Sequence, residues 1–184
     1  ETALDAVEDP RELLMAWMRS ADNPYFARAI VNRVWASYFN VGIVEPPDDL
    51  SLANPPSNEP LLDHLASRFR EHGYDLKWLH REICSSRTYQ LSWQPNATNA
   101  GDDRNFARSV PRRVPAEVIY DAIKIATAGN EESQALCSLE ADRAIDDPIV
   151  DPRRPDYALS VFGQSIRESN CDCDRSMEPS LLQT

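Results

Sequence analysis

One stretch decides the fold class of this 184-residue chain: Asn23-Pro24-Tyr25-Phe26-Ala27-Arg28-Ala29-Ile30-Val31-Asn32-Arg33-Val34-Trp35-Ala36-Ser37-Tyr38. Its apolar residues recur at intervals of four, in one series from Phe26 to Tyr38 and in a second from Ala27 to Trp35. At 100° per residue these two series cover an arc of roughly 200°. The pattern predicts a helix from about residue 23 to 41, ended by Gly42 and buried on more than one side.

Four more helices follow from the same start and stop signals. Asp9-Pro10 begins a helix over 10–20, and Pro60 begins one over 60–71 that Gly73 ends. Asp75 caps a fourth helix. Pro115 opens a fifth, which ends before Gly129 and has an expected core side of Ala116, Ile119, Ala122, Ile123 and Ala126. The sequence therefore predicts a mainly α fold, a compact multi-helix domain with long Pro-rich loops.

The chain divides by pattern into two parts. Residues 1–129 are expected to form the helical domain, and 130–184 an irregular, acidic and Pro-rich extension, with a further helix beginning near Pro179 and truncated at 184. Because the sequence starts at Glu1 without Met, we expect a fragment of a longer protein, in which a signal peptide would not be visible here.

Composition excludes several classes of function. There are 5 Gly against 14 Pro, which disfavours Gly-rich phosphate loops and many-turned β-sandwiches. The chain has 19 basic and 30 acidic residues, and its net charge is −11. Non-specific nucleic-acid binding needs a basic surface, so neither nucleic acid nor an anionic membrane is an expected partner. No stretch approaches the ~18 apolar residues of a membrane span.

Two groups of acids are weak candidates for chemistry. Glu45, Asp48 and Asp49 lie in the Pro-rich connection 43–60 and could bind a divalent cation, or could serve turns and a cap. Glu117 and Asp121 are one helical turn apart and could form a metal site or an acid/base pair. The alternative for this pair is an Arg–carboxylate network with the nearby Arg113.

A structural network is the favoured interpretation of the polar residues beside apolar helix surface, with an anion pocket as the alternative. These residues are Arg28, Asn32, Arg33, Arg87 and Tyr89, of which the first three lie on the narrow non-apolar sector of the 23–41 helix. The three histidines His64, His72 and His80 are spaced by eight and do not have the i,i+4 spacing of a helical zinc pair.

The cysteines Cys84, Cys137, Cys171 and Cys173 form no CxxC or CxxCH motif, which leaves this segment without a haem-attachment or zinc-ribbon signature. Cys171 and Cys173 are too close to bridge each other without strain. Either could pair with Cys84 or Cys137 in an oxidising compartment; reduced thiols are the equal alternative.

A set of short motifs, in order along the chain, resembles the planctomycete-specific domain of unknown function. The motifs include Asn23-Pro24-Tyr25-Phe26-Ala27-Arg28, Asn32-Arg33-Val34-Trp35, Gly42-Ile43-Val44, Asp48-Asp49-Leu50, Pro60-Leu61-Leu62-Asp63-His64-Leu65-Ala66, Asp75-Leu76-Lys77-Trp78-Leu79-His80, Ser86-Arg87-Thr88-Tyr89-Gln90, Ala116-Glu117-Val118-Ile119-Tyr120-Asp121-Ala122 and Cys171-Asp172-Cys173-Asp174-Arg175. The resemblance covers most of the chain. It implies the C-terminal part of a large exported bacterial protein, with a cytochrome-c-like, haem-binding domain elsewhere in the polypeptide, and it carries over no catalytic residue.

The expected function is a non-catalytic interaction or structural module of such an exported protein. Its partners would be other domains of the same polypeptide or a cell-surface protein, and this segment would hold no cofactor. The alternatives are a hydrolase-like domain acting on polysaccharide through its acids, which would need two carboxyls facing one cleft, and a divalent-cation-binding domain.

Overall fold

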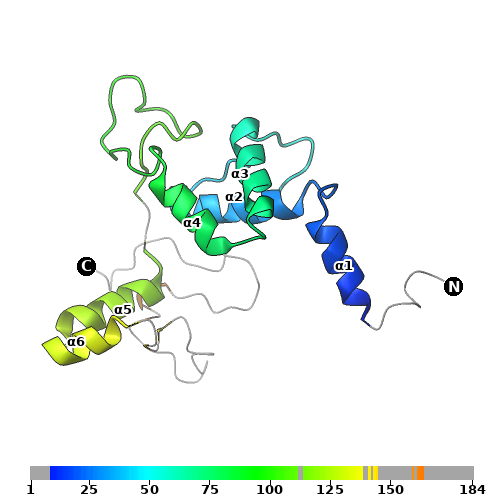
Figure 1. Cartoon of the computed structure of the whole chain (residues 1–184). Coiled ribbons are helices and arrows are strands. Elements are labelled where there is room, and N and C mark those ends of the chain that lie inside the picture. The colour runs from blue at the N-terminus through cyan, green and yellow to red at the C-terminus, as the bar shows by residue number, and fades with distance from the viewer. Residues whose placement is uncertain are drawn as a thin grey trace. The chain divides into compact units, whose positions relative to one another are not determined.

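The chain forms helices joined by long loops in the computed structural model, which describes residues 9–111, 114–138, 141, 143–144, 159 and 161–163. The helices are α1 (Pro10–Arg19), α2 (Phe26–Phe39), α3 (Glu59–Glu71), α4 (Leu76–Ser85), α5 (Ala116–Thr127) and α6 (Asn130–Leu136). The described residues contain no strand (Figure 1), so the predicted mainly α fold is confirmed.

Contacts divide the chain into two compact units, Glu1–Arg112 and Arg113–Thr184. The division falls before α5 and not after residue 129 as the helix pattern suggested, because α5 packs on α6. α6 itself lies in the segment where no regular element was expected.

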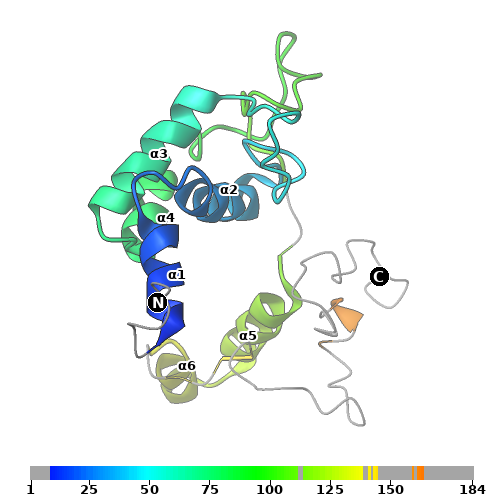
Figure 2. The ribbon, with the colours of Figure 1, turned by 90° about the vertical axis from the view of Figure 1, so that its right-hand side faces the viewer.

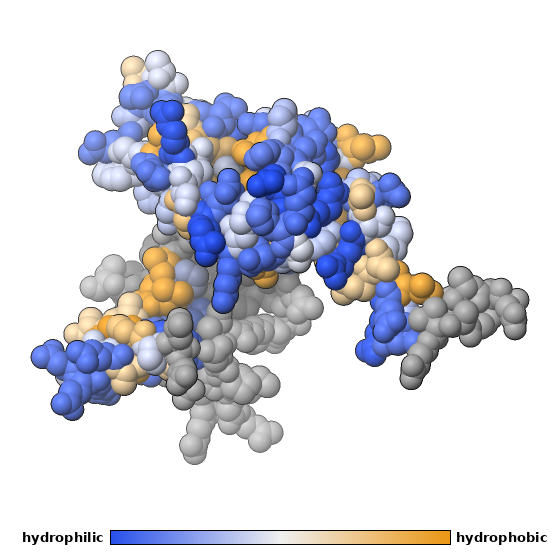
Figure 3. Space-filling model, in the orientation of Figure 1, coloured by the Kyte–Doolittle hydropathy of each residue, from blue (hydrophilic) through white to orange (hydrophobic). Residues whose placement is uncertain are grey.

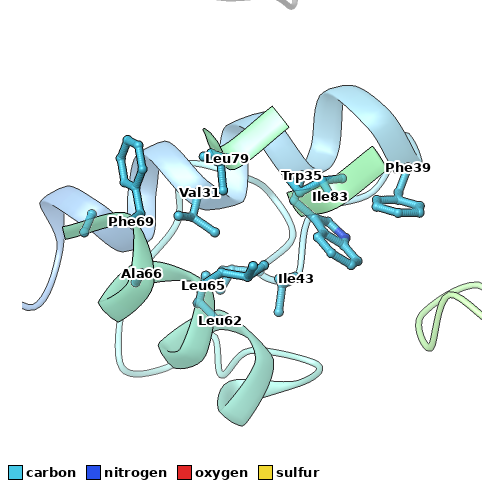
Figure 4. Close-up of a cluster of buried hydrophobic side chains, with 12 residues drawn as sticks. Val31, Trp35, Phe39, Ile43, Leu62, Leu65, Ala66, Phe69, Leu79 and Ile83 are labelled. Carbon is cyan, nitrogen blue, oxygen red and sulfur yellow. The ribbon is translucent and has the colours of Figure 1, made fainter. Parts of the chain in front are cut away.

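In the first unit, α2 contacts α1, α3 and α4, and α3 contacts α4. Side chains from α2, α3 and α4 meet in a buried core (Figure 4) that includes Val31, Trp35, Leu62, Phe69 and Leu79. The Ala27–Val31–Trp35 series is fully buried, whereas Ile30, Val34 and Tyr38 of the other series are partly buried at its edge. The packing therefore confirms the central position predicted for α2.

Capping side chains set several helix ends. Asp9, Asn58 and Asp75 accept hydrogen bonds from first-turn backbone N–H groups. Before α2, Asn23 Oδ1 accepts from the N–H groups of Tyr25 and Phe26. The left-handed residue that ends α2 is Asn40 (φ 64°), not Gly42, since asparagine tolerates this conformation better than most residues.

The connection between α2 and α3 is tied to the body of the unit. Ile43 and Val44 belong to the buried core. The Ile43 carbonyl accepts from the backbone N–H and the hydroxyl of Ser57, at 2.7 and 3.0 Å. The two ends of this Pro-rich segment are thus joined to each other and to α2.

A second long loop runs from Ser92 to Ser109 and is closed at its base, where Ser109 N–H donates to the Ser92 carbonyl at 3.1 Å. The ring of Phe106 lies edge-on to Trp35 and Phe39, with centroids 5.1 and 5.6 Å away, and so anchors the loop on α2. Phe106 adopts φ 54°, a conformation that a bulky residue holds only when its surroundings enforce it. We call this segment the 92–109 loop.

In the second unit, α5 buries its first turn, at Ala116 and Glu117. The expected core side is only partly correct, because Ala122, Ile123 and Ala126 are exposed. Burial is concentrated at the N-terminal end of the helix and does not follow its whole apolar stripe.

α1 contributes no buried residue to the first unit, and Figures 1 and 2 show its ribbon extending away from α2, α3 and α4. No helix among the described residues is long and apolar enough to span a membrane.

We predict that Gly42→Ala lowers the free energy of unfolding by roughly 1–3 kcal/mol, the usual effect of overpacking. An added Cβ would overlap the Val44 carbonyl oxygen and lie 3.0 Å from Asn32 Nδ2. Urea denaturation measures the effect. Gly101→Ala, where a Cβ would meet nothing within 4 Å, is the matched control, and equal midpoints for the two variants would contradict the packing described here.

Candidate functional site

The most constrained polar group in the first unit is the Asn32 side chain, which is 0% exposed. Its Nδ2 donates to the carbonyls of Val44 and Pro47, both at 2.9 Å, and its Oδ1 accepts from Val44 N–H at 3.0 Å. The sequence placed Asn32 on a non-apolar sector of the helix. The structure instead buries it, which is possible because the amide satisfies three backbone groups that would otherwise be orphaned.

The two arginines beside Asn32 form ion pairs on the surface. Arg33 binds both carboxylate oxygens of Asp48, at 2.7 and 2.8 Å, which fastens α2 to the connection after it. Arg28 pairs with Asp63 and, at 3.5 Å, with Glu59, which fastens α2 to the first two turns of α3. Because both guanidinium groups are paired with carboxylates of the chain itself, the structure favours the structural network over an anion pocket.

Arg87 and Tyr89 lie in the turn after α4. Arg87 is exposed, and within the described residues its guanidinium makes no hydrogen bond or ion pair. Tyr89 packs edge-on against Tyr38, with ring centroids 5.6 Å apart. Arg113 lies outside the described residues.

Each of the three candidate acids in the 43–60 connection accepts a hydrogen bond from a different group. Glu45 Oε2 accepts from Gly42 N–H at 2.7 Å, and Asp49 Oδ1 accepts from Ser51 N–H at 3.3 Å. The hydrogen bonds from Arg33 hold the pKa of Asp48 below its ordinary value. The described part of the chain contains no group of three or more His, Cys, Asp or Glu that could hold a metal ion. The geometry favours turn and cap roles over a cation site.

In the second unit Glu117 is buried and Asp121 is half-buried. The Asp121 carboxylate accepts from Ala144 N–H, at 3.1 and 3.3 Å, and so ties α5 to the chain beyond α6. Cys84 and Cys137 are free thiols. Cys171 and Cys173 lie outside the described residues, so the proposed pairing stays a prediction.

Two surface features of the first unit were not predicted. The first is the apolar side of α1, where Leu14 is 55% and Trp17 is 61% exposed and Leu13 is exposed as well. Figure 3 shows hydrophobic side chains at the surface there. The helical spacing of these residues predicted the helix, but nothing in their spacing indicates whether a partner covers it.

The second feature is a pair of pockets that flank the 43–60 connection. One, of about 270 Å³, lies where α2 and α3 begin and is lined by Tyr25, Arg28, Pro55 and Glu59 among others. The other, of about 370 Å³, is lined by Glu45, Asn54 and Ser57 and by Asp103 and Arg104 of the 92–109 loop. Asn54 and Ser57 stand on either side of Pro55 and Pro56. Polar residues beside prolines in a long connection are the sequence signal that would have indicated these two as pocket-lining residues.

The fold is a mainly α domain in which the candidate acids Glu45, Asp48, Asp49 and Asp121 each make a hydrogen bond or ion pair within their own unit. A family model described as "PSD1: Protein of unknown function (DUF1553)" matches residues 10–184, nearly the whole chain. The chain belongs to this family, which confirms the expected membership in a family of unknown function. Comparison with curated proteins and with solved structures found no match.

We predict that Asn32→Ala lowers the free energy of unfolding by about 3 kcal/mol, because it leaves buried backbone groups of Val44 and Pro47 without partners. Arg33→Ala, at the next position, removes an exposed ion pair and should cost about 0–1 kcal/mol. Urea denaturation of both variants provides the comparison. An Asn32→Ala midpoint no lower than that of Arg33→Ala would rule out the amide as the main attachment of the connection.

We also predict that the Asp48 carboxyl titrates below its ordinary pKa of 3.8 and moves back toward that value in Arg33→Ala. The small stabilisation that this pair contributes is present above pH 3.8 and is lost as the pH falls through the lowered pKa. Carboxyl-carbon NMR titration measures both values. Asp102 is the internal control, since the backbone N–H groups of Asn105 and Arg104 lower its pKa and the Arg33 substitution leaves them in place.

Proposed function

We propose that this domain is a non-catalytic interaction module of a larger exported, haem-associated bacterial protein, and that it docks through the apolar face of α1. We define this face as Leu13, Leu14 and Trp17, which lie within an arc of about 100° on the helix. The uncovered face is the observation that carries the proposal.

Physical arguments support an interaction role for the α1 face. A ten-residue helix is marginal on its own in water, and exposed contiguous apolar patches are typical of interaction sites. The C-terminal end of α1 is already fixed to the body. Tyr74 hydroxyl donates to the Arg19 carbonyl at 3.2 Å, and the Arg19 guanidinium lies 5.2 Å from the centre of the Tyr74 ring. The face is thus presented from one anchored end.

The occupied acids favour interaction over hydrolysis. Asp48 is held in a bidentate pair with Arg33, and Asp121 accepts from a backbone N–H group. A general acid or a carboxylate nucleophile must be able to approach substrate. Each of these carboxylates is instead directed at a partner within its own unit.

The exported context rests on the resemblance to the planctomycete-specific domain. That resemblance implies domains that precede this one in a longer polypeptide, including a cytochrome-c-like domain that would hold the haem. Because the match to the family begins at residue 10, where α1 begins, we propose a preceding domain of the same polypeptide as the occupant of the α1 face.

The docking proposal predicts slow amide exchange in α1 of the full-length protein. Leu14→Gln/Trp17→Gln should speed the exchange of α1 amides by about tenfold or more, because polar side chains weaken burial of the face. Hydrogen–deuterium exchange measures this. Leu52→Gln is the matched control, since Leu52 is a 98% exposed apolar residue in the 43–60 connection and not in α1. Fast exchange of α1 in the unmodified full-length protein would overturn the docking role.

The exported, haem-associated context has a separate test. The complete reading frame should encode a signal peptide and an upstream CxxCH motif, and the purified protein should show a c-type haem absorption band. A frame that lacks both features would overturn the context without affecting the test of α1.

A further inference from the structure

The pocket of about 370 Å³, which we call the Glu45 pocket, has walls from two loops. The segment after α2, together with Asn54 and Ser57, forms one wall, and Asp103 and Arg104 of the 92–109 loop form the other. Its volume falls within the range of small-ligand sites. Because Phe106 is packed on Trp35 and Phe39, the loop that carries the second wall is held to the body.

The first wall has no side-chain hydrogen-bond donor left for a ligand. Asn54 Nδ2 donates to the carbonyls of Glu45 and Asp49, at 3.1 and 3.0 Å, which uses both of its N–H bonds. The single hydroxyl proton of Ser57 is used on the Ile43 carbonyl. What remains is the Asn54 carbonyl oxygen, the Ser57 lone pairs and the Glu45 carboxylate, which are all acceptors.

The Glu45 carboxylate is held in place while it retains acceptor capacity. Gly42 N–H donates to Oε2 at 2.7 Å, and a carboxylate with two oxygens offers about four acceptor sites. On the opposite wall Asp103 adds a second carboxylate and Arg104 adds one guanidinium, so negative charge predominates in the lining.

From this arrangement we infer that the Glu45 pocket binds an organic cation rich in N–H donors, a primary ammonium or a guanidinium group. Such a group supplies the donors that Glu45, Asn54 and Ser57 lack, together with the charge that complements two carboxylates. The same chemistry is available from a free small amine and from a Lys or Arg side chain. The inference does not depend on the proposed docking of α1.

Calorimetric titration of the 184-residue chain with 1,5-diaminopentane and with butylguanidinium, at about 0.15 M salt to screen non-specific attraction, tests the inference. We expect saturable binding of at least one probe. Asp103→Asn should weaken it at least fivefold, and it should leave the fold intact because no hydrogen bond or ion pair of the Asp103 side chain occurs within the described residues. Glu82→Gln makes the same charge change on the exposed surface of α4 and should leave binding unchanged.

Two further probes separate the alternatives. Tetramethylammonium has the same charge as a protonated amine but no N–H, and it should not bind. The peptide acetyl-Gly-Lys-Gly-amide distinguishes the sources: binding supports recognition of a protein side chain, whereas binding of free amines alone supports a small-molecule ligand.

The inference is overturned if neither amine nor guanidinium binds at 10 mM (about 2.7 kcal/mol of binding free energy), or if Glu82→Gln weakens binding as much as Asp103→Asn. Binding of tetramethylammonium as tight as that of the amine would show that net charge alone attracts the cation, and it would contradict recognition through N–H donors. Displacement of the amine by stoichiometric Ca²⁺ would assign the pocket to a metal ion instead.

Discussion

The first unit depends on one side-chain amide. Asn32 lies in the middle of α2, and its hydrogen bonds with Val44 and Pro47 bring the following connection against the helix. That contact allows Ile43 and Val44 to enter the core beside residues of α2 and α3. It also places Gly42 and Glu45 in one pocket wall and the 50–56 segment in the other pocket. The hydrogen bonds of the fully buried Asn32 amide contribute more to the free energy of unfolding than the exposed ion pairs of Arg28 and Arg33.

Helix positions could be predicted from the sequence because their signals are local. Asp9 and Asp75 cap their helices and Pro10 takes the first helical position, as expected. The signals at Pro24 and Pro115 are less exact, since α2 begins at Phe26 and Pro115 is itself the N-cap of α5. The end of α2 was harder to predict. Asn40 takes the left-handed position, and Gly42 is required instead because any side chain there would collide with Val44 and Asn32. Close approach between segments distant in sequence leaves no periodic signal.

The candidate sites were less predictable for the same reason. The pairing of Arg33 with Asp48 spans fifteen positions, and the approach of Asp103 to Glu45 depends on how two long loops fold. Periodicity placed α5 correctly, but the predicted core side was only partly correct, because Ile123 is exposed. α6 was not predicted because a helix of seven residues, of which only Ala135 and Leu136 are apolar, is too short for a recognisable pattern.

The closed base of the 92–109 loop has a practical consequence. Once Ser92 and Ser109 are joined, the length of chain between them contributes little to the free energy, about 0.6 kcal/mol for each doubling. Only Phe106 ties the interior of the loop to the aromatic side chains of α2. The stretch around Gly101, whose Cα faces open space, is therefore a natural insertion point for an affinity tag or a fluorophore-labelling sequence.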